Sequence, residues 1–195
     1  IDKRIGSKFL HAGPGFGGSC FPKDVKAFTS TAKKFNVNFS ILEAVNTSNQ
    51  KRVDNIVKKI LNKVKFDSNS VIGFLGLSFK PNTDDIRESP AIAVVNKLLK
   101  LESNLKVYDP SISDILEKGG LPTGLESIET YSTPISAATN ADALVILTEW
   151  NEFKEIDLIE LKENMAVPII FDGRNIYESK EMREIGFEYY GVGLK

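Results

Sequence analysis

The sequence has few of the residues that build disulfide or metal sites. It contains one cysteine and one histidine in 195 residues, which excludes an internal disulfide and a cysteine-rich zinc site, so we expect no metal site. The 25 Lys and Arg residues nearly balance the 26 Asp and Glu residues, giving a formal net charge of −1. A chain so close to neutral has no overall electrostatic attraction for nucleic acid or for an anionic membrane. We therefore expect neither as a partner.

Long hydrophobic runs are also missing. The longest stretch that is uncharged and mostly apolar is residues 71–79, far shorter than the roughly 20 residues of a membrane-spanning helix. No charged-then-apolar leader opens the sequence, so we expect a cytoplasmic protein. The chain starts with Ile1 rather than Met, which suggests that it begins within a longer protein. Its length lies between one and two typical domains of about 150 residues, enough to bury a core.

Residues 1–67 have a helical pattern. Pro22 is expected at the first position of a helix, and apolar residues recur behind it at helical spacing. These residues are Val25, Phe28, Ala32 and Phe35. A second apolar pattern predicts an amphipathic helix of about 25 residues, with Ser40 as its N-cap and Glu43 completing a capping box. The Lys-rich face of this helix is typical of a solvated surface, with a phosphate or partner contact as the alternative.

After a turn-like boundary at residues 66–70, the pattern alternates between strands and helices. Ser89 and Pro90 are expected to open a helix that runs to about residue 101. Strands are predicted at residues 71–77, 105–108, 143–148 and 167–171, and an edge strand at 187–190. Strands that alternate with helices favour a doubly wound parallel sheet with functional groups at the carboxyl ends of its strands. The fold class is therefore α/β: a helical segment, residues 1–67, followed by a Rossmann-like domain, residues 68–195.

Four glycines occur within residues 13–18, in the run GPGFGG. This run formally matches the dinucleotide-binding fingerprint, but no clear strand precedes it and its helix cannot open before Pro22. Residues 33–38, where an acid for the ribose would be needed, contain no carboxylate. We therefore interpret the run as a loop without Cβ atoms whose backbone can wrap closely around a ligand.

Cys20 follows this loop and directly precedes the expected helix. The positive end of the helix dipole and the nearby Lys23 would both favour a thiolate. Asp24 comes one helical turn later, where its carboxylate could orient water in a later step. A lone cysteine is more often a small buried apolar residue, but the glycine-rich lead-in and the position at a helix start favour a nucleophile.

Three runs carry a family resemblance. The run FLHAGPGFGGSCFPKD at residues 9–24 resembles the catalytic cysteine segment of the UDP-glucose 6-dehydrogenase family, within the UDP-glucose/GDP-mannose dehydrogenases. GLSFKPNTDDIRESP at residues 76–90 resembles the signature that opens the family's carboxyl-terminal domain, and FDGRN at residues 171–175 resembles a third motif. The resemblance implies NAD-dependent oxidation of the primary alcohol of UDP-glucose to UDP-glucuronate through two hydride transfers.

The resemblance also implies roles for individual residues. Cys20 would trap the aldehyde as a thiohemiacetal whose oxidation gives a thioester, and Asp24 would assist proton transfer or activate water for hydrolysis. Phe79 and Lys80 would contact the UDP, and Arg174 the diphosphate or the sugar. The full set of implied substrate contacts is Arg4, Phe9, His11, Gly13, Gly15, Phe16, Gly17, Phe79, Lys80 and Arg174. The implied NAD contacts are Lys23 and Arg87.

Further expectations concern what surrounds this segment. The resemblance implies a homodimer through the long helix, with Arg4 reaching the sugar in the neighbouring subunit. The family's amino-terminal NAD domain has no match in residues 1–195, so NAD would bind mainly elsewhere and this portion would be inactive alone. His11 is expected to donate a hydrogen bond rather than act as a base. Asp109 stands where a ribose-binding acid would, but a turn-forming Asp-Pro is the preferred interpretation.

Two alternatives remain open. One is a portion of a GDP-mannose 6-dehydrogenase, although those enzymes typically place Leu after the cysteine, where this chain has Phe21. The other is a non-catalytic module that binds nucleotide sugars or dimerises. Such a module would keep Phe79, Lys80 and Arg174 but would have no use for Cys20.

Overall fold

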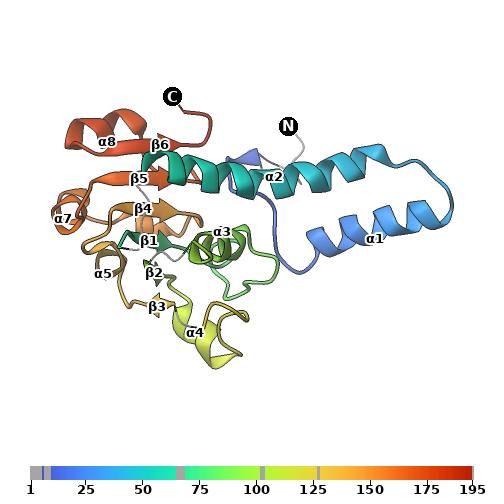
Figure 1. Cartoon of the computed structure of the whole chain (residues 1–195), viewed down its shortest axis with the longest axis horizontal. Helices are drawn as coiled ribbons and strands as arrows, with labels where there is room; N and C mark the ends of the chain where they lie inside the picture. The colour runs from blue at the N-terminus through green and yellow to red at the C-terminus, as the bar shows by residue number, and fades with distance from the viewer. Residues whose placement is uncertain (1–5, 7–9, 65–68, 102–103, 127, 195) are drawn as a thin grey trace.

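The computed structural model describes residues 6, 10–64, 69–101, 104–126 and 128–194. An α/β body is preceded by two helices, α1 (Phe21–Lys34) and α2 (Ser40–Lys63). Figure 1 shows α1 beside the first half of α2, the two extending together away from the body as an arm. The expected boundary at residues 66–70 falls largely outside the described residues. Across the described part of the chain, no helix combines the length and apolar character needed to cross a membrane.

Within the described residues, six strands form one parallel sheet in the order β3-β2-β1-β4-β5-β6. The strands are β1 (Val71–Leu75), β2 (Asn104–Tyr108), β3 (Glu129–Thr130), β4 (Ala143–Ile146), β5 (Ile169–Asp172) and β6 (Glu188–Gly191). The strand order reverses between β1 and β4, the arrangement of a Rossmann-like doubly wound sheet. The predicted fold class is therefore confirmed, and β6 lies at an edge as expected. β3 was missed because its two residues are both exposed and carry no apolar pattern.

Helices cover both faces of the sheet (Figure 1). They are α3 (Pro90–Leu99), α4 (Ile112–Glu117), α5 (Pro134–Ala138), α6 (Asn151–Lys154), α7 (Leu158–Asn164) and α8 (Ser179–Ile185). One core joins α3 and the second half of α2 to the sheet. The other core packs α5, α7 and α8 against the opposite face. Successive β4 side chains enter the two cores alternately, which explains why this strand is apolar throughout.

The helix starts agree only in part with the sequence pattern. Ser89 caps α3 as expected, since its Oγ accepts from Ala91 N at 3.2 Å. Pro22 occupies the second position of α1 rather than the first, because the helix already begins at Phe21. Ser40 is the first residue of α2 and not its N-cap. Asn38 Oδ1 accepts from Ser40 N at 3.1 Å instead.

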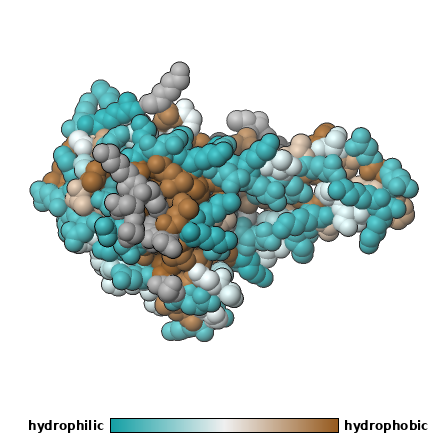
Figure 2. Space-filling model, in the orientation of Figure 1, coloured by the Kyte–Doolittle hydropathy of each residue, from teal (hydrophilic) through white to brown (hydrophobic). Residues whose placement is uncertain are grey.

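The apolar residues at helical spacing in α1 are buried only in part. Val25 is buried, whereas Phe28 and Phe35 are 64% and 76% exposed. The expected capping box of α2 does not form, and Glu43 pairs with Lys33 of α1 at 3.0 Å. The exposed Phe28 and Phe35 side chains lie on the arm and not on the body. Figure 2 shows apolar residues exposed along the arm and at its far end.

Candidate active site

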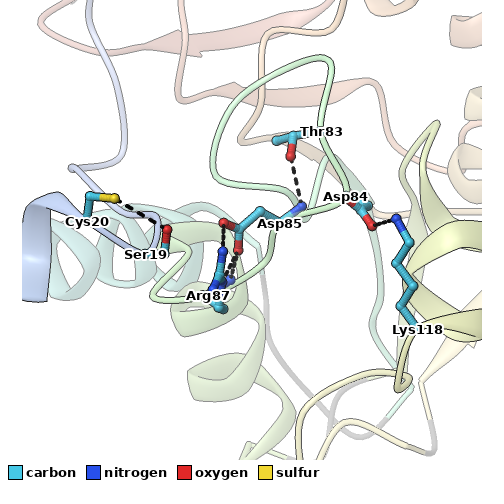
Figure 3. A network of polar contacts seen from close by, with 7 residues as sticks. All are labelled: Ser19, Cys20, Thr83, Asp84, Asp85, Arg87 and Lys118. Atoms are coloured by element: carbon cyan, nitrogen blue, oxygen red, sulfur yellow. Dashed lines mark hydrogen bonds and ion pairs between the residues drawn. The ribbon is translucent and has the colours of Figure 1, made fainter.

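Cys20 lies at the amino end of α1 and is exposed. The first bond of the helix runs from Asp24 N to Cys20 O at 2.9 Å. The thiol Sγ lies 3.7 Å from the Ser19 hydroxyl oxygen (Figure 3). The alternative that Cys20 is a small buried apolar residue is therefore excluded. An exposed thiol at the positive end of a 14-residue helix is placed to act as a nucleophile.

The charged neighbours of the thiol on α1 are themselves exposed. The Lys23 Nζ lies 3.5 Å from the Asp24 carboxylate, and the two side chains are 71% and 68% exposed. Asp24 thus has Lys23 as its ion-pair partner in this structure. Its expected role in orienting water stays a prediction.

The glycine-rich loop is held by two side chains of α2. Asn49 pairs with both backbone groups of Phe16, accepting from its N–H at 2.9 Å and donating to its carbonyl at 3.0 Å. Arg52 Nε donates to the Gly13 carbonyl at 3.1 Å. The Phe16 N–H is therefore bonded within the protein and is not free to bind a ligand. Neither Asn49 nor Arg52 was singled out in the sequence, because an amide and a cation on a polar helix face resemble ordinary solvated residues.

The same loop packs against the connection that follows β1. Gly18 has φ +87°, and a Cβ atom there would lie 2.8 Å from the Phe79 ring. A Cβ atom on Gly17 would lie 2.5 Å from the Glu88 carbonyl oxygen. These glycines are required because two stretches of backbone and an aromatic ring approach closely. The cysteine segment and the segment at residues 76–90 are thus in direct contact.

Phe79 and Lys80 lie in the connection from β1 to α3. Phe79 N donates to the Asp85 carbonyl at 3.1 Å, and the Lys80 Nζ lies 5.3 Å from the Phe79 ring centroid. Lys80 is exposed and Phe79 half-buried. A ring and a cation side by side at the carboxyl end of a strand suit a nucleotide diphosphate.

Arg87 lies in the same connection, next to the cysteine segment (Figure 3). Its guanidinium donates to both oxygens of the Asp85 carboxylate, from Nε at 2.9 Å and from Nη2 at 2.8 Å. These hydrogen bonds lower the pKa of Asp85 and raise the pKa of Arg87. The Arg87 side chain remains 70% exposed, so part of its surface is open to an anionic ligand.

Arg174 follows β5 and is held by two acidic residues. Its guanidinium forms an ion pair with Glu149, which follows β4, and its backbone N–H donates to Asp172 Oδ1 at 2.8 Å. The Arg174 side chain is 16% exposed. It also lies against Gly13, where a Cβ atom would overlap the guanidinium. Glu149 was missed because its partner is 25 positions away in the sequence.

The structure thus brings residues of all three sequence motifs to the carboxyl end of the sheet. Gly13, Gly17 and Gly18 contact the segments that carry Arg174, Glu88 and Phe79. Gly15 lies against Asn49, and the Phe16 ring packs edge-on against Phe21 with centroids 4.6 Å apart.

His11 is exposed. Arg4 and Phe9 lie outside the described residues, so their expected roles stay predictions.

Two family models match the chain. The model described as "UDP-glucose/GDP-mannose dehydrogenase family, UDP binding domain" matches residues 73–179, more than half of the chain. The model of the same family's central domain matches residues 1–51. The chain belongs to the UDP-glucose/GDP-mannose dehydrogenase family. The UDP-binding match contains Phe79, Lys80, Arg87 and Arg174, and the central-domain match contains Cys20.

Individual family members are similar over the whole chain. The UDP-glucose 6-dehydrogenase of Rhizobium meliloti (strain 1021) is 44% identical over 194 residues, which cover 99% of this chain and 43% of that protein. YwqF, a UDP-glucose 6-dehydrogenase of Bacillus subtilis (strain 168), is 43% identical and covered to 43% of its length. A solved UDP-glucose dehydrogenase from Pyrobaculum islandicum superimposes with a TM-score of 0.81 at 31% identity, covering 100% of this chain and 42% of that one. The chain therefore spans less than half the length of these family members.

Proposed function

We propose that this chain is the carboxyl-terminal portion of an NAD-dependent UDP-glucose 6-dehydrogenase, which oxidises UDP-glucose to UDP-glucuronate. The contact between the glycine-rich loop and Phe79 carries this proposal, because it joins the cysteine segment to the nucleotide-binding segment. A nucleophile whose segment contacts a nucleotide-binding segment suits a reaction on the sugar of a nucleotide sugar. Phe21 after the cysteine favours UDP-glucose over GDP-mannose.

The substrate nucleotide is assigned to the connection after β1. The Phe79 ring stacks on the base, and the exposed Lys80 ammonium meets the diphosphate. Arg174 contacts the diphosphate or the sugar beside Gly13. Because Arg174 is mostly buried and fixed by Glu149, its position needs little ordering when substrate binds.

The chemistry at the sugar is assigned to Cys20 and Asp24. The Cys20 thiolate adds to the aldehyde carbon left by the first oxidation, and the new C–S bond makes a thiohemiacetal. The second oxidation at the same carbon leaves a thioester. Water, deprotonated by Asp24, then attacks the carbonyl carbon. The C–S bond breaks, UDP-glucuronate leaves and the cysteine is regenerated.

NAD, when bound, accepts the hydride in both oxidations. The residues of this chain that suit it are Lys23 and Arg87, two largely exposed cations near the amino end of α1 that can face its diphosphate. The sheet itself does not fit the cofactor, since the turn after β1 has no glycine fingerprint and Asp109 at the end of β2 is fully buried. We therefore assign most of the NAD contacts to residues outside this chain and expect these 195 residues alone to be inactive as a dehydrogenase.

A homodimer is assigned to the arm made by α1 and α2. Phe28, Phe35 and Ile41 are 64%, 76% and 72% exposed there, and a second copy of the arm would remove these side chains from water. The expected contact of Arg4 with a neighbouring subunit belongs to this proposal.

Thiol alkylation tests the proposal, because Cys20 is the sole cysteine of the chain. We expect the thiol at neutral pH to react with iodoacetamide faster than a model thiol and to be protected by UDP-glucose. Protection should be lost in Lys80→Gln, whereas Lys180→Gln, on the exposed face of α8, is the matched control. A slow thiol that UDP-glucose does not protect would support the non-catalytic module instead.

A further inference from the structure

Asp109 is a fully buried carboxylate that no step above uses. It directly follows β2, and its side chain is 0% exposed. In dinucleotide-binding sheets a carboxylate at this place accepts the ribose hydroxyl. Here the carboxylate is turned into the protein, so a ligand cannot reach it. Burying a carboxylate is costly unless several donors surround it.

Protein donors surround both oxygens of this carboxylate. Oδ2 accepts from the backbone N–H groups of Leu77 at 2.7 Å and Ser78 at 3.0 Å, and from the Ser78 hydroxyl at 3.0 Å. Oδ1 accepts from the backbone N–H of Ser111 at 2.9 Å and from its hydroxyl at 2.6 Å. One oxygen therefore binds the connection after β1, and the other binds the connection after β2.

The segment held by Oδ2 leads directly into Lys80. Its other side is fixed by the segment that follows β4, because Thr148 Oγ1 donates to the Ser78 carbonyl at 2.6 Å and Trp150 Nε1 donates to Ser78 Oγ at 3.2 Å. Ser89 at the start of α3 donates to the Leu77 carbonyl at 2.7 Å. The chain is thus fixed from several elements just before the exposed Lys80 side chain emerges.

We propose that Asp109 is a positioning residue for substrate binding: it fixes the backbone from which Lys80 reaches the diphosphate of the nucleotide sugar. This inference rests on the proposed function, which places the diphosphate at Lys80. Asp109 itself does not touch the ligand. A carboxylate is required because an amide would turn its NH₂ group toward N–H donors on one side or the other.

A double-mutant cycle measured by calorimetry with UDP tests this role. In the 195-residue chain we expect Asp109→Asn to weaken UDP binding about tenfold, in the range found when a buried hydrogen-bonded group loses its partners. In the Lys80→Gln background the same change should have less than a twofold effect, because Asp109 acts through Lys80. A purely structural role would weaken binding equally in both backgrounds, and that result would overturn the inference.

Two serines provide a matched pair in case Asp109→Asn does not fold. Ser78→Ala and Ser111→Ala each remove one hydroxyl donor to the same carboxylate, and both serines are buried. Both should lower the thermal midpoint, but Ser78→Ala should weaken UDP binding several-fold while Ser111→Ala leaves it unchanged within twofold. Equal effects on UDP binding would overturn the inference.

The experiment also separates this inference from the proposed function. If the wild-type chain binds UDP and Lys80→Gln weakens the binding while Asp109→Asn does not, the nucleotide site stands and the positioning role is overturned. If the wild-type chain does not bind UDP, the proposed nucleotide site fails and the positioning role fails with it.

Discussion

The backbone N–H of Gly18 donates to the carbonyl oxygen of Arg87 at 3.0 Å. This bond joins the cysteine segment to the connection between β1 and α3, two parts of the chain that are 69 positions apart. It places Cys20, two residues after Gly18, close to the charged pair of Asp85 and Arg87 (Figure 3). The cysteine segment and the connection between β1 and α3 are therefore held together by a backbone hydrogen bond as well as by the contact of Gly18 with Phe79.

Gly18→Ala should disturb this junction. Its φ of +87° is unfavourable for an L-residue, and the new Cβ would lie 2.8 Å from the Phe79 ring. We expect a loss of about 2–3 kcal/mol in the free energy of unfolding, measured by urea denaturation, and weaker UDP binding. Gly124→Ala is the matched control, with φ +90° and nothing within 4 Å of the Cβ position. Equal effects of the two variants on stability and on UDP binding would show that contact with Phe79 is unimportant.

Glu149→Gln should destabilise the protein by leaving Arg174 without a carboxylate. The two side chains are 29% and 16% exposed, and Glu149 Oε2 and Arg174 Nε are buried without a hydrogen-bond partner. We expect a loss of about 1–3 kcal/mol in the free energy of unfolding, because a mostly buried charge loses its partner.

The matched control for this ion pair lies on α8. The Lys180 Nζ lies 3.7 Å from Glu184 Oε1, and the two side chains are 89% and 67% exposed. Lys180→Ala should therefore produce no measurable change in the free energy of unfolding. An equally small effect of Glu149→Gln would mean that Arg174 finds another partner or reaches water.

The ion pair of Asp85 and Arg87 should make stability depend on pH in the acid range. Hydrogen bonds from Arg87 lower the pKa of Asp85 in the folded protein. The contribution of the pair is therefore fully present above the unfolded-state pKa of about 3.9 and is lost as the pH falls through the lower folded-state value. Arg87→Gln should reduce stability at pH 7, and the difference from wild type should disappear on acidification. Denaturation series from pH 7 to about 2 would measure this. A difference that stays constant with pH would contradict it.

The fold could be predicted from the sequence where the signal is local. Ser89 before Pro90 predicted the start of α3, and the apolar run at residues 143–148 predicted a strand, which the structure has as β4 (Ala143–Ile146). The exposure of Phe28 and Phe35 could not be predicted, because helical spacing identifies an apolar face but not what covers it. The candidate site residues predicted from the sequence, apart from Arg4, lie in contiguous motifs. Asn49 and Glu149 were missed because their partners are distant in sequence, so their roles appear only when the sheet and α2 come together.

Asn49 supplies the last test, since it holds the glycine-rich loop through both of its amide atoms. Asn49→Ala removes both bonds while keeping helix propensity on α2. We expect amide exchange at Phe16 to accelerate at least tenfold, while exchange in the strands of the sheet stays within twofold, as measured by hydrogen exchange with peptide resolution. Asn62→Ala, at an exposed position of the same helix, should leave the loop unchanged. If Phe16 exchanges at the wild-type rate in Asn49→Ala, the loop is held mainly by its contacts with Arg52, Arg87 and Phe79, and α2 would position it only through Arg52.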